Sequence, residues 1–109
     1  KFKGTPVTKV GKVDLPLEFQ LKQNIPNPFN PGTVISYQLS VAGNVNLKIH
    51  DIQGRVVATL VNEEQLAGSY NVSFNSKQTT NYTSLSAGIY FYTLMIPGFT
   101  QTKKMVFLK

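Results

Sequence analysis

The amino-acid sequence predicts an all-β domain, an antiparallel sandwich of about seven strands. Along most of the chain apolar and polar residues alternate with a period of two, as they do when successive side chains of a strand point to opposite faces of a sheet. Turn-forming residues separate the alternating segments at short intervals. The 109 residues, 41% of them hydrophobic and 15% charged, suffice for one hydrophobic core and are typical of a globular domain.

Seven segments are expected to form strands, because each carries apolar residues on a common face. In chain order they are marked by Phe19 and Leu21; Ile35, Tyr37 and Leu39; Val45, Leu47 and Ile49; residues 56–61; Tyr70, Val72 and Phe74; residues 88–96; and residues 99–108. Turns are expected at residues 42–44, 51–54 and 97–98, each of which contains a glycine. Residues 61–66 are the one segment whose pattern also allows a short helix, ending before Gly68.

A corner before the sixth strand favours a sandwich over a small barrel. Tyr90 lies just inside that strand and follows a turn that contains Gly88. This arrangement resembles the tyrosine corner of immunoglobulin-like and fibronectin-like domains, in which the hydroxyl bonds to the backbone upstream. The predicted fold is therefore an immunoglobulin-like or fibronectin-like antiparallel β-sandwich. The chain has no Cys and no Trp, so the Cys…Trp…Cys framework of antibody domains is absent.

The first 14 residues differ from the rest of the chain. They mix Gly, Pro, Thr, Val and Lys without a sustained period, so we expect a linker from an upstream domain, a boundary near Pro16, and one folded domain at residues 15–109. The sequence begins at Lys1 without a start methionine, which suggests a piece of a larger protein. This tail holds four of the eleven cations behind the net charge of +6. Because no basic stripe concentrates the others, nucleic-acid binding is not expected.

The composition also excludes several kinds of site. Without Cys there is neither a disulfide nor a thiolate metal site, which fits an exported protein. No segment approaches the roughly 20 apolar residues of a membrane-spanning helix. The sequence shows no phosphate-binding loop, dinucleotide motif or EF-hand, so neither a cofactor nor a bound metal is expected.

The polar residues that could support catalysis are better explained by structure. His50, the only histidine, precedes Asp51 and could in principle be a general base with its orienting carboxylate. Alternation places His50 on the polar face of its strand, whereas Asp51 opens an Asp-x-x-Gly turn in which a carboxylate accepts backbone N–H bonds. Glu63 and Glu64 are adjacent and would point apart on a strand, so they offer no facing pair of acids. We therefore expect no enzyme.

Three prolines lie within six residues in the segment Pro26-Asn27-Pro28-Phe29-Asn30-Pro31. Such a segment cannot lie inside a sheet, because proline fixes φ and lacks a donor. Its PxxP pattern is common by chance. The expected role is a stiff connector between the first two strands, anchored by Phe29.

The last expected strand departs from the alternation of the others. Lys103 and Lys104 precede a run that is apolar on both faces, Met105-Val106-Phe107-Leu108, closed by Lys109. Either the domain covers both faces, as for a central strand under loops, or one apolar face is kept for a partner. The pattern alone leaves both alternatives open.

Five motifs, taken together and in order, resemble a known family. They are Gln23–Pro31 (QNIPNPFNP); Leu47–Val57 with Asp51, Gly54 and Arg55 (LKIHDIQGRVV); Ala67–Tyr70 (AGSY); Leu85–Tyr92 with Gly88 and Tyr90 (LSAGIYFY); and Thr102–Lys109 (TKKMVFLK). This order is similar to that of the C-terminal sorting domain, type A, of the type IX (Por) secretion system of Bacteroidetes, and to the immunoglobulin-like domain of the flagellar hook-capping protein. Residues 76–83 depart from the pattern as an insertion.

The resemblance implies a non-catalytic signal carried by secreted cargo. In this family the outer-membrane translocon recognises the domain, and a cell-surface sortase removes it and joins the cargo to anionic lipopolysaccharide. For this chain, that implies recognition at residues 103–109, cleavage between Gly11 and Gln23, and transport through the periplasm to the cell surface. The alternative is a carbohydrate-binding or adhesion module of the same fold, although only Phe91 and Tyr82 are aromatic candidates for an exposed binding face.

Overall fold

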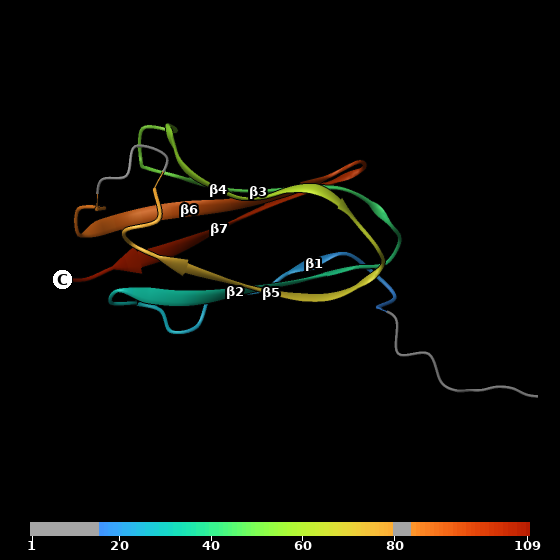
Figure 1. The fold of residues 1–109 in the computed structure, drawn as a ribbon, viewed down its shortest axis with the longest axis horizontal. Helices are drawn as coiled ribbons and strands as arrows, with labels where there is room; N and C mark the ends of the chain where they lie inside the picture. The colour runs from blue at the N-terminus through green and yellow to red at the C-terminus, as the bar shows by residue number, and fades with distance from the viewer. Residues whose placement is uncertain (1–15, 80–83) are drawn as a thin grey trace, which may run out of the picture.

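The computed structural model describes residues 16–79 and 84–109, and these residues form seven strands (Figure 1). The strands are β1 (Gln20–Leu21), β2 (Gly32–Leu39), β3 (Gly43–His50), β4 (Val56–Gln65), β5 (Gly68–Asn75), β6 (Gly88–Ile96) and β7 (Phe99–Phe107). The linker expected at residues 1–14 lies outside the described residues. The described part of the chain contains no helix long and apolar enough to cross a membrane.

Two antiparallel sheets lie face to face, as Figure 1 shows. One has the strand order β1-β2-β5, and the other has the order β4-β3-β6-β7. In the first sheet β2 pairs with β5 over its whole length, from Gly32 opposite Asn75 to Leu39 opposite Gly68. In the second, β6 pairs with β7 from Gly88 opposite Phe107 to Ile96 opposite Phe99. The predicted all-β sandwich is confirmed.

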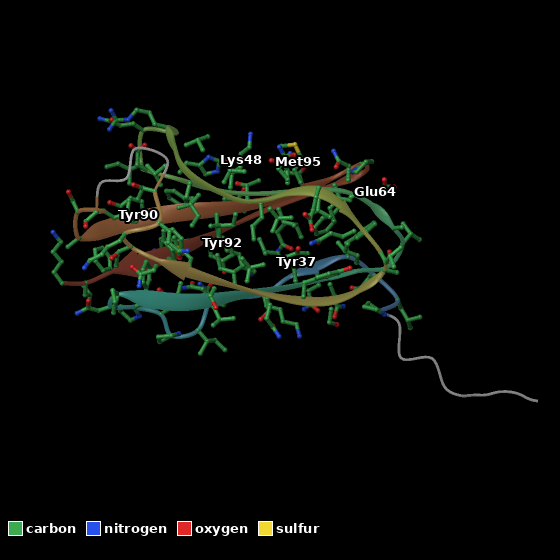
Figure 2. The ribbon with its side chains drawn as sticks, viewed as in Figure 1. Tyr37, Lys48, Glu64, Tyr90, Tyr92 and Met95 are labelled. Atoms are coloured by element: carbon green, nitrogen blue, oxygen red, sulfur yellow. The ribbon has the colours of Figure 1, made fainter. Side chains whose placement is uncertain are left out.

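The core lies between the sheets and is supplied by alternate residues of each strand. The largest fully buried side chains include Tyr37 and Tyr92, which point toward the space between the sheets in Figure 2. The expected inward residues of β2 and β3 are all buried: Ile35, Tyr37, Leu39, Val45, Leu47 and Ile49. Burying an apolar side chain of this size contributes about 1.5–3 kcal/mol, which is why the period-two pattern fixes which face turns inward.

The alternative helix at residues 61–66 is wrong, because β4 continues through this segment to Gln65. β4 pairs with β3 as far as Gln65 opposite Gly43, and the register shifts twice along the way, between Leu47 and Lys48 and between Ile49 and His50. These irregularities disturb the apolar period of β4, so its pattern does not read as a regular strand. A helix of one or two turns could not compete with a continuous hydrogen-bonded ladder.

The first strand is shorter than its pattern suggests. Only Gln20 and Leu21 pair with β2, opposite Gln38 and Tyr37. Phe19 precedes the strand and packs on the ring of Phe99, with 5.5 Å between the ring centroids. Leu21 is buried and Phe19 is half-buried, so the pair still marks the inward side of the chain.

Because successive strands run in opposite directions, the connections between them lie alternately at the two ends of the sandwich. In Figure 1 the C-terminus lies at one end, together with the β1–β2, β3–β4 and β5–β6 connections. The described N-terminal segment lies at the opposite end, with the three remaining connections. Three of the five motifs noted above therefore meet the C-terminal strand at one end of the molecule.

Candidate functional site

β7, the C-terminal strand, is an edge strand of the four-stranded sheet and not a central one. Its seven expected recognition residues divide by position. Met105 and Phe107 point inward and are buried in the core, whereas Val106 is half-buried on the outer face. Lys104, Leu108 and Lys109 are exposed, and Lys103 is half-buried. In the folded domain, the surface available at this strand is thus a subset of the residues that the motif suggested.

The proline-rich segment lies along the free edge of β7. Phe29 N donates a hydrogen bond to Val106 O at 2.9 Å, and Leu108 N donates to Phe29 O at 3.0 Å. Asn27 accepts a bond from Val106 N through its Oδ1 at 2.9 Å. Three peptide bonds of the segment, before Pro26, Pro28 and Pro31, are cis. The segment therefore satisfies backbone groups that an edge strand would otherwise expose.

Further contacts extend this cover along the strand. Gln23 Nε2 donates to Lys104 O at 2.8 Å, and Leu21 N donates to Gln101 Oε1 at 3.3 Å. We call residues 23–29 the edge cover, because they supply most of these bonds. Backbone N–H and C=O groups of Lys104, Val106 and Leu108 thus form hydrogen bonds with residues more than 70 positions earlier in the sequence.

Phe29 holds the edge cover on the core. Its ring stacks on Phe107, with 5.2 Å between centroids, and meets Phe74 edge-on at 6.2 Å. Phe29 is 1% exposed, although Pro26, Asn27 and Pro28 around it are exposed. An aromatic side chain in a loop is thus part of the core and ties the loop to the last residue of β7.

The Asp51 carboxylate organises the turn between β3 and β4. Its Oδ1 accepts bonds from Gln53 N at 2.9 Å and from Arg55 N at 3.0 Å, and its Oδ2 pairs with Arg55 Nε at 2.9 Å. Partial desolvation acts to raise the pKa of Asp51, but the hydrogen bonds from Arg55 and Gln53 and the charge of Arg55 outweigh it, so the pKa lies below its ordinary value. Gly54 completes the turn at φ +85°.

The corner before β6 has the geometry of a tyrosine corner. Tyr90 Oη donates to Ser86 O at 2.7 Å, and Gly88 between them has φ +151°. Burial raises the pKa of Tyr90, and the nearby charge of Asp51 adds to the effect. This corner and the Asp51 turn line an open cavity of about 320 Å³. Two motifs that are distant in sequence therefore form one surface at the C-terminal end of the sandwich.

His50 lies on the outer face of the four-stranded sheet. Its Nε2 is 2.8 Å from Thr93 Oγ1, which is in turn 2.8 Å from Thr102 Oγ1. The ring thus bonds across the sheet, whereas the Asp51 carboxylate bonds to its own turn. Within residues 16–79 and 84–109, no three His, Asp or Glu side chains gather as a group that could hold a metal ion.

The sequence model of the secretion system C-terminal sorting domain matches residues 24–108. The chain belongs to this family. The match spans residues 24–29 of the edge cover and all of β7, and it indicates a sorting role in type IX secretion. None of the curated proteins matches the chain.

A solved structure supports the fold of the sorting domain. It is PorZ, an essential bacterial surface component of the type IX secretion system of Porphyromonas gingivalis, with a TM-score of 0.56 and 17% sequence identity. The similarity covers 80% of this chain and 11% of PorZ, so this chain matches only a small part of the length of that protein. At this identity the likeness concerns the fold.

The sorting domain contains a second corner that the sequence reasoning did not single out. Tyr70 Oη donates to Leu66 O at 2.6 Å, across Gly68 at φ +150°. The spacing and geometry match those of Tyr90, Gly88 and Ser86. The signal was available, because Ala-Gly-x-Tyr occurs at residues 67–70 and again at residues 87–90.

Of the insertion expected at residues 76–83, part is described. Ser76 is 2% exposed, its N–H donates to Pro31 O at 2.9 Å, and its carbonyl accepts a bond from Leu85 N at 2.9 Å. Gln78 N closes a turn on Asn75 O at 2.8 Å. Residues 80–83, including Tyr82, lie outside the described residues. The start of the insertion is thus part of the packed structure of the sorting domain.

Proposed function

We propose that this sorting domain is a non-catalytic signal that directs a secreted protein across the outer membrane by type IX secretion and to attachment at the cell surface. Its partners are the outer-membrane translocon, which reads the C-terminal strand, and a cell-surface sortase. The cargo is an upstream domain of the same chain, joined through residues 1–14. The observation that carries the proposal is the family match over residues 24–108, which includes β7 and all of the edge cover except Gln23.

The arrangement of the two ends supports this role. β1 starts at the end of the sandwich opposite the C-terminus (Figure 1). An upstream cargo domain would therefore lie away from Leu108 and Lys109, which are exposed. A signal at the far end of the module stays accessible whatever cargo precedes it.

The segment before β1 is suited to proteolytic removal of the domain. Leu17 is 98% exposed, and Glu18 is also exposed. Pairing with β2 begins only at Gln20, so the described residues before it, 16–19, take no part in the ladder. Within the expected window from Gly11 to Gln23, we place the cut before Gln20. The sortase would then join the released cargo to anionic lipopolysaccharide.

The absence of chemistry in this module is part of the proposal. His50 and Asp51, which are adjacent in sequence, bond to different groups: the ring to Thr93 and the carboxylate to Arg55. A base and its orienting carboxylate would instead need to bond to each other. This arrangement favours a structural role for both residues.

The alternative of a carbohydrate-binding or adhesion module receives less support. Sugar-binding faces commonly present a row of exposed aromatic rings. Over residues 16–79 and 84–109, the exposed large hydrophobic side chains are Leu, Ile, Val and Met, without an aromatic ring among them. Phe91, the expected outward aromatic, is half-buried.

The test is an export assay in a host that has type IX secretion. Residues 1–109 are fused to the C-terminus of a reporter that carries a signal peptide, and the reporter is located by fractionation. Deleting residues 103–109 would also remove Met105 and Phe107 from the core. A sharper variant therefore deletes only Leu108 and Lys109, which leaves the core intact.

The full fusion is expected to reach the medium or the cell surface, whereas the reporter alone stays in the periplasm. The variant without Leu108 and Lys109 is expected to fold and to remain in the periplasm. If the full fusion stays in the periplasm while the same cells export their native cargo, the sorting role is contradicted and the binding module is favoured. Export of the shortened fusion would show that Leu108 and Lys109 are not required for the signal to be recognised.

A further inference from the structure

The two outer faces of the sandwich differ in chemistry. The face of the β1-β2-β5 sheet is mostly polar along its paired strands, with Gln20 opposite Gln38, Ser36 opposite Asn71, and a bond of 2.6 Å between the Ser36 and Asn71 side chains. Its exposed apolar side chains are Val34 and the bridge partner of Val34, Ile25. The face of the other sheet carries apolar and cationic side chains. Since both faces belong to one small domain, solubility alone does not explain the difference.

We define the β6–β7 face by six residues that point outward from the four-stranded sheet: Lys48, His50, Ile89, Phe91, Lys104 and Val106. The pairing register makes them neighbours. Phe91 lies between His50 on β3 and Lys104 on β7, and Ile89 lies opposite Val106. Directly opposed side chains on one face lie within contact distance. Together the six residues form a continuous surface across three strands.

This surface exposes apolar area that a solvent-facing sheet does not need. Ile89 is 44% exposed, and Phe91 and Val106 are half-buried. Beyond the end of the strand, Leu108 adds a further side chain that is 51% exposed. Single exposed apolar residues are ordinary, but a contiguous set rimmed by polar residues is typical of an interaction surface.

The charge on the β6–β7 face has one sign. Lys48 and Lys104 supply cations, and the one described carboxylate that borders the face is that of Asp51, which lines a cavity together with Ile89. Asp51 is paired with Arg55 in its turn, Glu18 precedes β1, and Glu63 and Glu64 lie near the end of β4. Figure 2 shows Lys48 and Met95 on the outer side of the sheet, with Glu64 toward the far end of the molecule. The complementary surface of a partner is acidic.

A shallow cavity of about 100 Å³ adjoins this face and is lined by Asn46, Lys48, His50, Thr93 and Met95. Asn46 donates through Nδ2 to Asn62 Oδ1 at 3.3 Å, but its own Oδ1 is buried and accepts no bond from the described residues. Buried polar atoms are nearly always paired, so the unpaired Oδ1 of Asn46 is an exception among the described residues.

The edge of β7 is less available than its outer face. A partner strand added at the C-terminal end of this edge would have to displace the bonds that Asn27 and Phe29 make to Val106 and Leu108. Phe29 resists this displacement, because its side chain is anchored in the core at 1% exposure. Docking on the face does not require this displacement.

We propose that the secretion machinery binds the sorting domain through the β6–β7 face, by means of a protein surface that carries apolar and acidic side chains, and not by adding a strand to the edge of β7. This inference rests on the proposed function and names the surface that the translocon reads. Phe91 is its central residue, because it lies between His50 on β3 and Lys104 on β7, and Lys104 supplies the exposed cation at its edge.

The experiment uses the reporter fused to residues 1–109. The test variants are Phe91→Ala and Lys104→Glu, and the matched controls are Val34→Ala on the other outer face and Lys77→Glu at an exposed position after β5. The thermal unfolding of each purified variant is measured first. Removing a central interface side chain commonly weakens binding by about tenfold or more.

Exported reporter is expected to fall about tenfold for each test variant and to stay near the wild-type level for both controls. Lys104→Arg, which keeps the charge, is expected to restore export. Folded Phe91→Ala and Lys104→Glu variants that are exported as well as the wild type would overturn the inference, while the wild-type fusion would still support the sorting role. Failure of the wild-type fusion would count against the sorting role itself.

A cationic face could also bind an anionic lipid surface. Flotation of the purified chain with vesicles of phosphatidylglycerol and phosphatidylcholine distinguishes the two. Absence of flotation, together with lost export of Lys104→Glu, supports a protein partner. The proposal would be overturned in favour of a membrane surface if the wild-type chain floats with the vesicles, the Lys104→Glu chain does not, and the Lys104→Glu fusion is still exported.

Discussion

The hydroxyl of Tyr92 accepts a hydrogen bond from the backbone N–H of Asn24, which lies 68 positions earlier, at 2.8 Å. The same hydroxyl donates to Lys22 O at 2.7 Å. Tyr92 is fully buried on β6, whereas Lys22 and Asn24 belong to the connection that follows β1. One side chain of the four-stranded sheet therefore fixes the start of the edge cover from the inside.

Replacing Tyr92 by Phe should destabilise the domain by about 1–3 kcal/mol, because the buried N–H of Asn24 and the carbonyl of Lys22 lose their partner. The expected loss is measured by urea denaturation. Tyr70→Phe is the matched control, since the bond from Tyr70 to Leu66 O is exposed and water can replace it. This control should cost no more than about 1 kcal/mol. Equal losses for the two variants would contradict the structural role of Tyr92.

Stability should decrease at alkaline pH. Burial raises the pKa of Tyr37 and of Tyr92 to about 12, against an ordinary value of 10.0, although hydrogen bonds from Tyr37 to Gln65 and between Tyr92 and Asn24 act the other way. Between pH 10 and 12 the unfolded chain loses these protons and the folded chain keeps them. The contribution of these two tyrosines to the free energy of unfolding is therefore complete below pH 10 and is lost as pH rises toward 12.

The measurement is the free energy of unfolding at a series of pH values across this window. Lysine titration contributes to the slope of every variant, so the comparison between variants isolates the tyrosines. Tyr92→Phe removes one of the two groups and should give a shallower decline than the wild type. An identical decline would show that Tyr92 does not titrate differently in the two states.

Gly88 should be intolerant of a side chain for a backbone reason. Its φ of +151° is a conformation that L-residues rarely adopt, and a Cβ at this position would meet no heavy atom within 4 Å. Gly88→Ala should therefore cost about 1–3 kcal/mol through backbone strain and not through a clash. Gly68, at φ +150° in the second corner, should respond in the same way.

The control for this prediction is Gly32→Ala. Gly32 has no left-handed φ, and its added Cβ would lie 3.5 Å from Phe74 O, an ordinary contact. A compatible Gly→Ala change stabilises a protein by about 0.4–1 kcal/mol, because it restricts the unfolded chain. Thermal unfolding of the three variants measures the contrast. A Gly88→Ala variant as stable as Gly32→Ala would count against strain at the corner.

The sequence predicted the sheets better than their edges. The alternation of Val45, Leu47 and Ile49 reports burial directly, so the inward face of β3 followed from the pattern. The double-sided apolar run of β7 could not reveal its place in the sheet, because strand order depends on pairings between segments far apart in sequence. The position of β7 at an edge and its cover by residues 23–29 are visible only in the tertiary structure, where Phe29 packs on Phe107.

The β6–β7 face was hidden for a related reason. Phe91 and Ile89 alternate correctly within their own strand, and Lys104 and Val106 do so within theirs. Only the register that places Phe91 opposite Lys104 and Ile89 opposite Val106 gathers them into one surface. A single sequence carries the period of each strand but not the register between strands, which turn lengths and core packing decide together.

Phe29→Ala tests the edge cover itself. Removing a ring that is packed on Phe107 and Phe74 should cost about 3–5 kcal/mol, as is usual for a buried Phe→Ala change. Ile25→Ala, on the same connection but at a side chain that is 73% exposed, should change stability by no more than about 0.5 kcal/mol. Urea denaturation measures both.

Amide hydrogen exchange then locates the effect of Phe29→Ala along the chain. The N–H groups of Val106 and Leu108 bond to Asn27 Oδ1 and Phe29 O, so both should exchange faster once the edge cover loses its anchor. Amides in the β3–β4 ladder, at the other edge of the four-stranded sheet, should change only as much as global stability does. Unchanged protection at Val106 and Leu108 would mean that the hydrogen bonds to Asn27 Oδ1 and Phe29 O hold the cover on the edge of β7 without the Phe29 ring.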